Sequence, residues 1–191
     1  EDLELAKKII KKCVERYESP DYEGVSSTGV TQKGLRAQGH SFMMVWTLPQ
    51  LLALDKDPWF DALAREHLDC VLNKFWNNDY GISNEVLFHD YSRIPSRVHE
   101  TAPGHTIETQ WMAMTEAIRE KNGTHFYTLK NRIRRMIEMS WDDIFEGIGD
   151  GGYRVFKTDT APAGPAWDMK TMWAHCEVLV GSLMSLEYTG E

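Results

Sequence analysis

Apolar residues recur along the chain at the spacing of α-helices in six segments. Some segments have one apolar face and one charged face, as between residues 2 and 18 and between residues 125 and 145. Others are apolar or small nearly all round, from Met43 to Leu54 and from Met172 to Leu186. We predict that the first kind lies on the outside of the fold and that neighbours enclose the second kind. The predicted helices span residues 2–18, 34–54, 57–76, 104–122, 125–145 and 166–188.

A short motif repeats along these helices. The pattern GHxxxxxW occurs at His40 and again 65 residues later at His105, and a third histidine, His175, follows 70 residues further on. Alternating outer and inner helices with such a repeat predict a double-layered helical ring. Six hairpins would need about 390 residues. We therefore expect residues 1–191 to form about three hairpins of one barrel domain, as the C-terminal part of a longer chain.

Two long polar connections separate the helices, at residues 77–103 and 146–165. Each contains a short β-like run, Ile82 to Phe88 in the first and Tyr153 to Lys157 in the second, beside Gly or Pro. Connections of this length in a compact protein are usually functional. We expect them to form the rim of a site.

Composition narrows the classes of partner. The net charge is -8, so the chain lacks the basic excess that nucleic acids and anionic membranes attract. Residues 37–54 carry no formal charge, but their Gln, His and Pro residues predict a buried helix rather than a membrane span. Three separated cysteines, Cys13, Cys70 and Cys176, predict no disulfide framework. We expect a cytoplasmic protein with a small polar partner and leave homo-oligomerisation open.

Two strings carry the most specific pattern, PGHTIETQW at residues 103–111 and KTMWAHCEVLVGSLM at residues 170–184. Both are similar to signature segments of the N-acylglucosamine 2-epimerase family, which includes cellobiose 2-epimerases and mannose isomerases. There the first segment runs PGHxIExxW and the second resembles KxWWPHxE, in this order. The similarity extends over most of residues 30–188, and GGYRVF between the two strings resembles a short strand of the family.

The resemblance implies an all-α fold, an (α/α)6 barrel of which this chain is about half. It also implies a sugar 2-epimerase or aldose–ketose isomerase that acts on a free mono- or oligosaccharide. Inverting C2 means removing its proton to give an enediolate and returning a proton to the opposite face, so two bases must flank one carbon. Imidazole suits both steps because its pKa is about 6.5. The resemblance assigns these bases to His105 and His175, and the residues do not separate epimerase from isomerase.

Four further residues are candidates for the site. Glu108 lies one helical turn after His105, where its carboxylate would orient the imidazole or stabilise its cationic form. Trp173 matches a tryptophan of the family and would stack on a sugar ring or pack in the core. His40, through the internal repeat, and Glu177 are candidates for substrate binding.

Some residues favour simpler roles. A single histidine on an apolar helix is more often a hydrogen-bonded core residue than a catalyst. We expect Trp111 to pack in the core, because apolar residues flank it at helical spacing. Met172 and Ala174 stand where the family has Trp and Pro, so the details of sugar stacking stay open. We assign the remaining histidines to the surface: His67, His89, His99 and His125.

Two other functions remain as alternatives. No helix pairs histidines or carboxylates at metal-binding spacing, and the glycines near residue 150 lack the strand and helix of a nucleotide site, so we expect catalysis without metal or cofactor. A glycoside hydrolase would need two carboxylates across a scissile bond, and a non-catalytic α-solenoid would bind a peptide. The carboxylates available to a hydrolase are Asp142, Asp143, Asp150, Asp159 and Asp168.

Overall fold

The computed structural model describes residues 2–23, 25–26, 29–30, 33–143, 146–149, 154–155 and 170–190. All six predicted helices are present within these residues. The third continues into a π-helical segment, η1 (Cys70–Lys74), and a 3-10 turn, η2 (Pro95–Arg97), lies in the connection before the fourth. The α-helices are α1 (Asp2–Tyr17), α2 (Gln38–Leu54), α3 (Pro58–Asp69), α4 (Pro103–Arg119), α5 (Gly123–Ser140) and α6 (Met172–Thr189).

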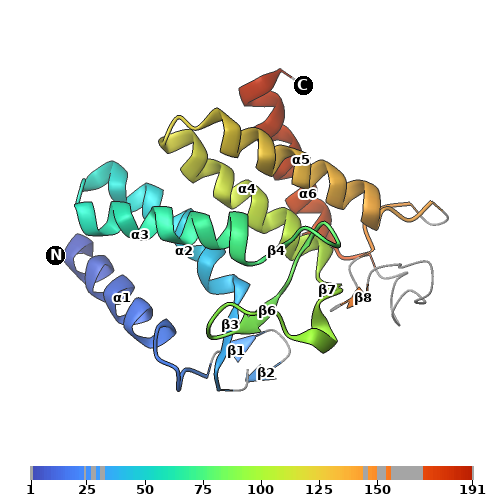
Figure 1. Cartoon of the computed structure of the whole chain (residues 1–191). Helices are drawn as coiled ribbons and strands as arrows, with labels where there is room; N and C mark the ends of the chain where they lie inside the picture. The colour runs from blue at the N-terminus through green and yellow to red at the C-terminus, as the bar shows by residue number, and fades with distance from the viewer. Residues whose placement is uncertain are drawn as a thin grey trace.

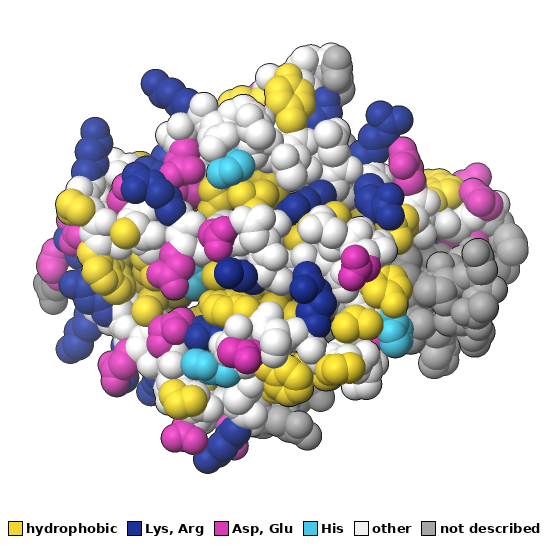
Figure 2. All heavy atoms as spheres, viewed as in Figure 1, with side chains coloured by type: hydrophobic (Ala, Val, Ile, Leu, Met, Phe, Trp, Pro, Cys, Tyr) yellow, Lys and Arg dark blue, Asp and Glu magenta, His cyan; other side chains and the backbone are white. Residues whose placement is uncertain are grey.

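Helix α4 lies at the centre of the fold (Figure 1). It packs against α2 on one side and α6 on the other, and α5 lies against it in a second layer, as α3 does against α2. Figure 2, viewed as Figure 1, shows acidic and basic side chains intermixed with small hydrophobic areas on this face. The inner row α2, α4, α6 and the outer helices α3 and α5 confirm the predicted double layer.

The predicted helix ends differ from the observed ones for local reasons. Helix α2 begins at Gln38 rather than at residue 34, because Leu35–Ala37 form a strand. Helix α5 ends at Ser140 rather than at residue 145, because the backbone of Trp141 is extended and pairs with Ile148. Helix α6 begins at Met172 after Thr171, whose side chain accepts the Ala174 N–H. The predicted first residues of that helix, 166–169, lie outside the described residues.

Neighbours within the described residues enclose α6 on one side only, as expected for the last inner helix of a half ring. Helices α4 and α5 cover the side that carries Ala174, Gly181 and Ser185. Leu179 and Leu183 on another side are 61% and 62% exposed. The apolar composition of a helix shows that the helix can be buried. Which of its faces are buried depends on the helices that pack against it.

Short antiparallel strand pairs hold the connections against the ends of the helices (Figure 1). The pair β3–β6 matters most for the site, because its register, Leu35 with Phe88 and Ala37 with Val86, places Glu85 beside the start of α2. The Gln38 N–H donates to the Glu85 carbonyl oxygen there, at 2.9 Å. The strands are β1 (Val25–Ser26), β2 (Gly29–Val30), β3 (Leu35–Ala37), β4 (Trp76–Asn77), β5 (Ile82–Ser83), β6 (Val86–Phe88), β7 (Glu100–Thr101) and β8 (Arg154–Val155).

The largest group of buried apolar side chains lies between α2, α4, α5 and η1 and includes Val45, Ile107, Leu129 and Met136. A second group joins α1 to α2 and α3 through Ile10. The lysine-rich first helix therefore buries part of its apolar stripe, whereas Ile9 and Cys13 of that stripe are exposed. None of the described helices is long and apolar enough to cross a membrane.

Candidate active site

His105 and Glu85 form the best-defined polar contact at the start of α4. The Nδ1 atom of His105 lies 3.0 Å from Oε2 of Glu85. Glu85 is 7% exposed, and its Oε1 accepts the N–H of Ala102, the residue before α4, at 3.3 Å. A carboxylate accepts hydrogen bonds but does not donate them when ionised, so Nδ1 carries the proton. The lone pair of the neutral imidazole then lies on Nε2, which becomes the basic atom.

Two aromatic rings lie beside this imidazole. The Trp173 ring of α6 meets the His105 ring edge-on, with centroids 5.0 Å apart, and the Phe42 ring of α2 is 6.1 Å away. Trp173 is 38% exposed, so part of its indole is open to a ligand. Stacking on the apolar face of a sugar needs such a partly open ring.

Two carboxylates extend the site along α4. Glu177 of α6 is buried, and its Oε2 accepts the Trp111 Nε1–H at 2.6 Å. Glu108 is half-buried one turn after His105. Burial, helped by the nearby Glu177 carboxylate and opposed by His105, raises the pKa of Glu108 to about 7. Glu108 is therefore able both to donate and to accept a proton near neutral pH.

His175 is placed differently from Trp173 and Glu177, although it lies between them in the sequence. Two residues along an α-helix turn the side chain by about 200°. The His175 Nδ1–H donates to the Thr171 carbonyl oxygen at 2.7 Å, and its Nε2 accepts the Ile148 N–H at 3.1 Å. Both ring nitrogens are thus bonded to the backbone. The predicted catalytic role of His175 stays a prediction.

His40 lies among tyrosines near the end of α1. The Tyr22 hydroxyl and His40 Nε2 are 2.5 Å apart, and the Tyr17 ring is 4.7 Å from the imidazole. Burial lowers the pKa of His40. Its predicted contact with a sugar stays a prediction, whereas His105, Glu108, Trp173 and Glu177 lie together at the α4–α6 interface.

The surface assignment of His67 is wrong. His67 is buried on α3, its Nδ1 lies 3.2 Å from the Ser41 hydroxyl, and burial lowers its pKa to about 4. The apolar stripe of α3 includes Phe60, Leu63 and Ala64, and its helical spacing continues to His67. That spacing was visible in the sequence. The other three histidines assigned to the surface, His89, His99 and His125, are partly exposed.

Glu85 was not predicted, and it makes the contact that defines the site. It stands in the connection SNEVLF, where it resembles any polar residue before a strand. Its partner is 20 residues away, so local periodicity carries no signal for the pair. The sequence predicted only that residues 77–103, which include Glu85, form the rim of a site.

The carboxylates considered for a hydrolase form no comparable group within the described residues. Asp142 is buried and pairs with Lys170 at 2.6 Å, and Asp143 is exposed. Asp150, Asp159 and Asp168 lie outside the described residues.

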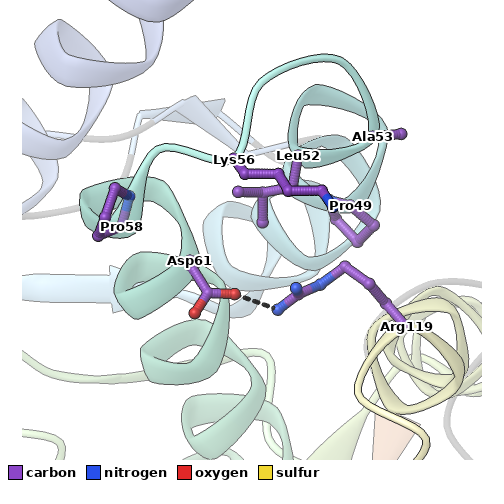
Figure 3. Close-up of a pocket in the computed structure, with 7 residues that line it drawn as sticks. All are labelled: Pro49, Leu52, Ala53, Lys56, Pro58, Asp61 and Arg119. Carbon is purple, nitrogen blue, oxygen red and sulfur yellow. Dashed lines mark ion pairs between the residues drawn. The ribbon is translucent and has the colours of Figure 1, made fainter.

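A pocket of about 530 Å³ lies away from these residues, where α2 ends, α3 begins and α4 ends. Two of its lining residues, Asp61 and Arg119, form an ion pair (Figure 3). Arg119 is 14 residues after His105, which corresponds to about 21 Å along α4. We place the chemistry at the start of α4 because the titratable groups gather there. The pocket lining is Pro49, Leu52, Ala53, Lys56, Pro58, Asp61 and Arg119.

The fold defines the chain as part of an α/α barrel. It superimposes on a cellobiose 2-epimerase from Bacillus thermoamylovorans with a TM-score of 0.72 and 14% identity, over 99% of this chain and 50% of the other. For a cellobiose 2-epimerase from Spirochaeta thermophila the TM-score is 0.69 at 11% identity, over 98% and 49% of the two chains. For a D-mannose isomerase it is 0.65 at 16% identity, over 87% and 42%.

The chain belongs to the N-acylglucosamine 2-epimerase (GlcNAc 2-epimerase) family, whose model matches residues 1–191. It spans about half the length of the solved structures that it resembles. No curated protein sequence matches it.

Proposed function

We propose that this chain carries a proton-transfer site of a sugar 2-epimerase or aldose–ketose isomerase, with His105 as a base. The proposal rests on the contact between Oε2 of the buried Glu85 and Nδ1 of His105, which are 3.0 Å apart. Because this contact places the proton on Nδ1, Nε2 is the basic atom. Family membership and the partly open Trp173 ring beside His105 support a sugar as substrate. We infer a free mono- or oligosaccharide, since a carbon acid of this kind exists only in the open-chain form with its carbonyl.

The proposed reaction begins with His105 Nε2 taking the proton from C2. The electron pair of the C–H bond forms the C1–C2 double bond and the π electrons of the carbonyl move to its oxygen, which gives the enediolate; that oxygen then takes up a proton to give the enediol. The Glu85 carboxylate stabilises the imidazolium that forms. Glu108 supplies the proton to the oxygen, because with a pKa of about 7 it is about half protonated at neutral pH.

The return of the proton decides the product. If His105 returns it to C1 on the same face while the C2 hydroxyl gives its proton to the Glu108 carboxylate, the product is the ketose. Return to C2 from the opposite face gives the epimer and needs a second base. His175 is the base that the sequence predicts for that face, and in the observed arrangement its Nε2 would first have to release the Ile148 N–H.

The test is an incubation of the intact protein with a panel of free aldoses in deuterium oxide, followed by proton NMR. We expect loss of the C2 proton signal and the appearance of an epimer or a ketose. His105→Asn should remove most of the turnover and leave helical circular dichroism unchanged. His125→Asn, at the start of α5 near the other end of α4, serves as the matched control. Loss of helicity in His105→Asn would instead assign His105 to the core, and release of a reducing end would favour a hydrolase.

A further inference from the structure

His175 holds together two parts of the backbone that are far apart in the sequence. Its Nδ1–H donates to the carbonyl oxygen of Thr171, the residue that caps α6, and its Nε2 accepts the N–H of Ile148. Thr171 also accepts the Ala174 N–H through its side chain, at 3.3 Å. The imidazole therefore links the first turn of α6 to residues 146–149, which we call the Ile148 segment.

The Ile148 segment is itself tied to the end of α5. The Gly149 N–H donates to the Ser140 carbonyl oxygen, and the Asp142 N–H donates to that of Gly147, each at 3.0 Å. Ile148 is buried. The ion pair between Lys170 and Asp142 makes a second link to the start of α6. The His175–Ile148 hydrogen bond and the Lys170–Asp142 ion pair thus join the Ile148 segment and the end of α5 to the start of α6, the helix that carries Trp173.

The contact between the ring and the segment is tight. Gly147 has a φ of +91°, and a Cβ built there would lie 2.6 Å from His175 Nε2. Position 147 therefore favours glycine for two reasons: its backbone conformation strains other residues, and the imidazole leaves no room for a Cβ atom. A ring packed this closely against the backbone leaves Nε2 shielded by the segment.

We propose that His175 is a positioning residue. It fastens the Ile148 segment to the first turn of α6 and thereby sets the place of Trp173 against His105. The Nε2 lone pair of His175 accepts the hydrogen bond from the Ile148 N–H and takes no proton from the substrate. The effect on turnover rests on the function proposed above, whereas the effect on the Ile148 segment does not.

Two variants separate positioning from proton transfer. Gln carries a carbonyl oxygen near the place of Nε2, so His175→Gln keeps an acceptor for the Ile148 N–H but has no titratable group. His175→Ala removes the acceptor. Hydrogen exchange of the Ile148 amide in the intact protein should accelerate about tenfold or more in His175→Ala and less than threefold in His175→Gln, since a lost hydrogen bond weakens local protection.

Turnover should also be impaired more in His175→Ala than in His175→Gln. We expect kcat/KM to fall at least tenfold in His175→Ala, with a rise in KM because Trp173 is displaced, and to recover most of that loss in His175→Gln. Cys176→Ala, a change of the neighbouring exposed side chain on the same helix, is the matched control for both measurements.

Two results would overturn the proposal. If Gln and Ala variants lose turnover equally while the Ile148 amide stays protected in the Gln variant, His175 transfers a proton. If the Ile148 amide exchanges at the wild-type rate in His175→Ala, the imidazole does not hold the segment. Failure of the proposed function shows up separately, as absence of sugar turnover in the wild-type protein with the amide effect intact.

Discussion

Nδ1 of His105 and Oε2 of Glu85 lie 3.0 Å apart, although Glu85 stands 20 residues earlier in a connection between strands. The same carboxylate accepts the N–H of Ala102. Glu85 therefore fixes the imidazole and the start of α4 together. In this arrangement a loop residue decides which nitrogen of a helical histidine is basic.

Replacing Glu85 by Gln should lower kcat by about tenfold to a hundredfold, because the neutral amide no longer stabilises the imidazolium. KM for the sugar should change little, because Glu85 acts through His105. Steady-state kinetics checks this, and Glu85→Asp, which keeps the charge, should restore part of the rate. An unchanged kcat in Glu85→Gln would show that the contact is structural.

The free energy of unfolding should depend on the ionisation of Glu108 between about pH 4.5 and pH 7. Burial and Glu177 raise the pKa of Glu108 to about 7 in the folded chain from 4.5. Below pH 4.5 the group is protonated in both states and contributes nothing. As pH rises through this window the unfolded state loses the proton first, so the folded state is progressively destabilised. The full cost, reached above pH 7, should be about 1–2 kcal/mol, since Glu108 is only partly buried.

The measurement for Glu108 is the thermal midpoint as a function of pH. Glu108→Gln should be more stable than the wild type at pH 8 and similar to it at pH 4. An equal difference at both pH values would show that packing rather than ionisation causes the effect. The variant should also lose turnover if Glu108 supplies the proton to the carbonyl oxygen.

The two tryptophans near the site should differ in what they support. Trp173→Ala should raise KM for the sugar several-fold with little loss of stability, because the ring is partly exposed. Trp111→Phe should destabilise the fold by about 1–3 kcal/mol, because the buried Glu177 carboxylate loses its donor. Sugar kinetics and denaturant unfolding on both variants test the distinction, and a reversed pattern would exchange the two roles.

The open face of α6 should make the 191-residue chain self-associate. Leu179 and Leu183 are 61% and 62% exposed, and contiguous exposed apolar surface favours association. Sedimentation velocity at tens of micromolar should show oligomers, and the double change Leu179→Gln, Leu183→Gln should reduce them. Tyr127→Gln, on the outer helix α5, is the control. A well-behaved wild-type monomer would contradict this expectation.

The six helices followed from periodicity, because the spacing of apolar residues depends on one helix at a time. The family strings singled out His105, His175, Glu108, Trp173 and Glu177. The structure gathers His105, Glu108, Trp173 and Glu177 between α4 and α6, whereas both ring nitrogens of His175 bond to the backbone. The helical spacing that buries His67 was also present in the sequence, beside Phe60 and Leu63. These features are local, so they were open to prediction.

Other features depend on how distant segments pack. The Glu85–His105 pair joins residues 20 positions apart, the Trp111–Glu177 bond joins residues 66 apart, and the His175–Ile148 bond joins residues 27 apart. A hydrogen bond needs its two atoms within a few tenths of an ångström of one distance, and the sequence states only which groups exist. The sequence alone determined which helices form and which residues can do proton chemistry; the tertiary structure decided which nitrogen of each histidine is engaged, because only packing brings a specific partner to it.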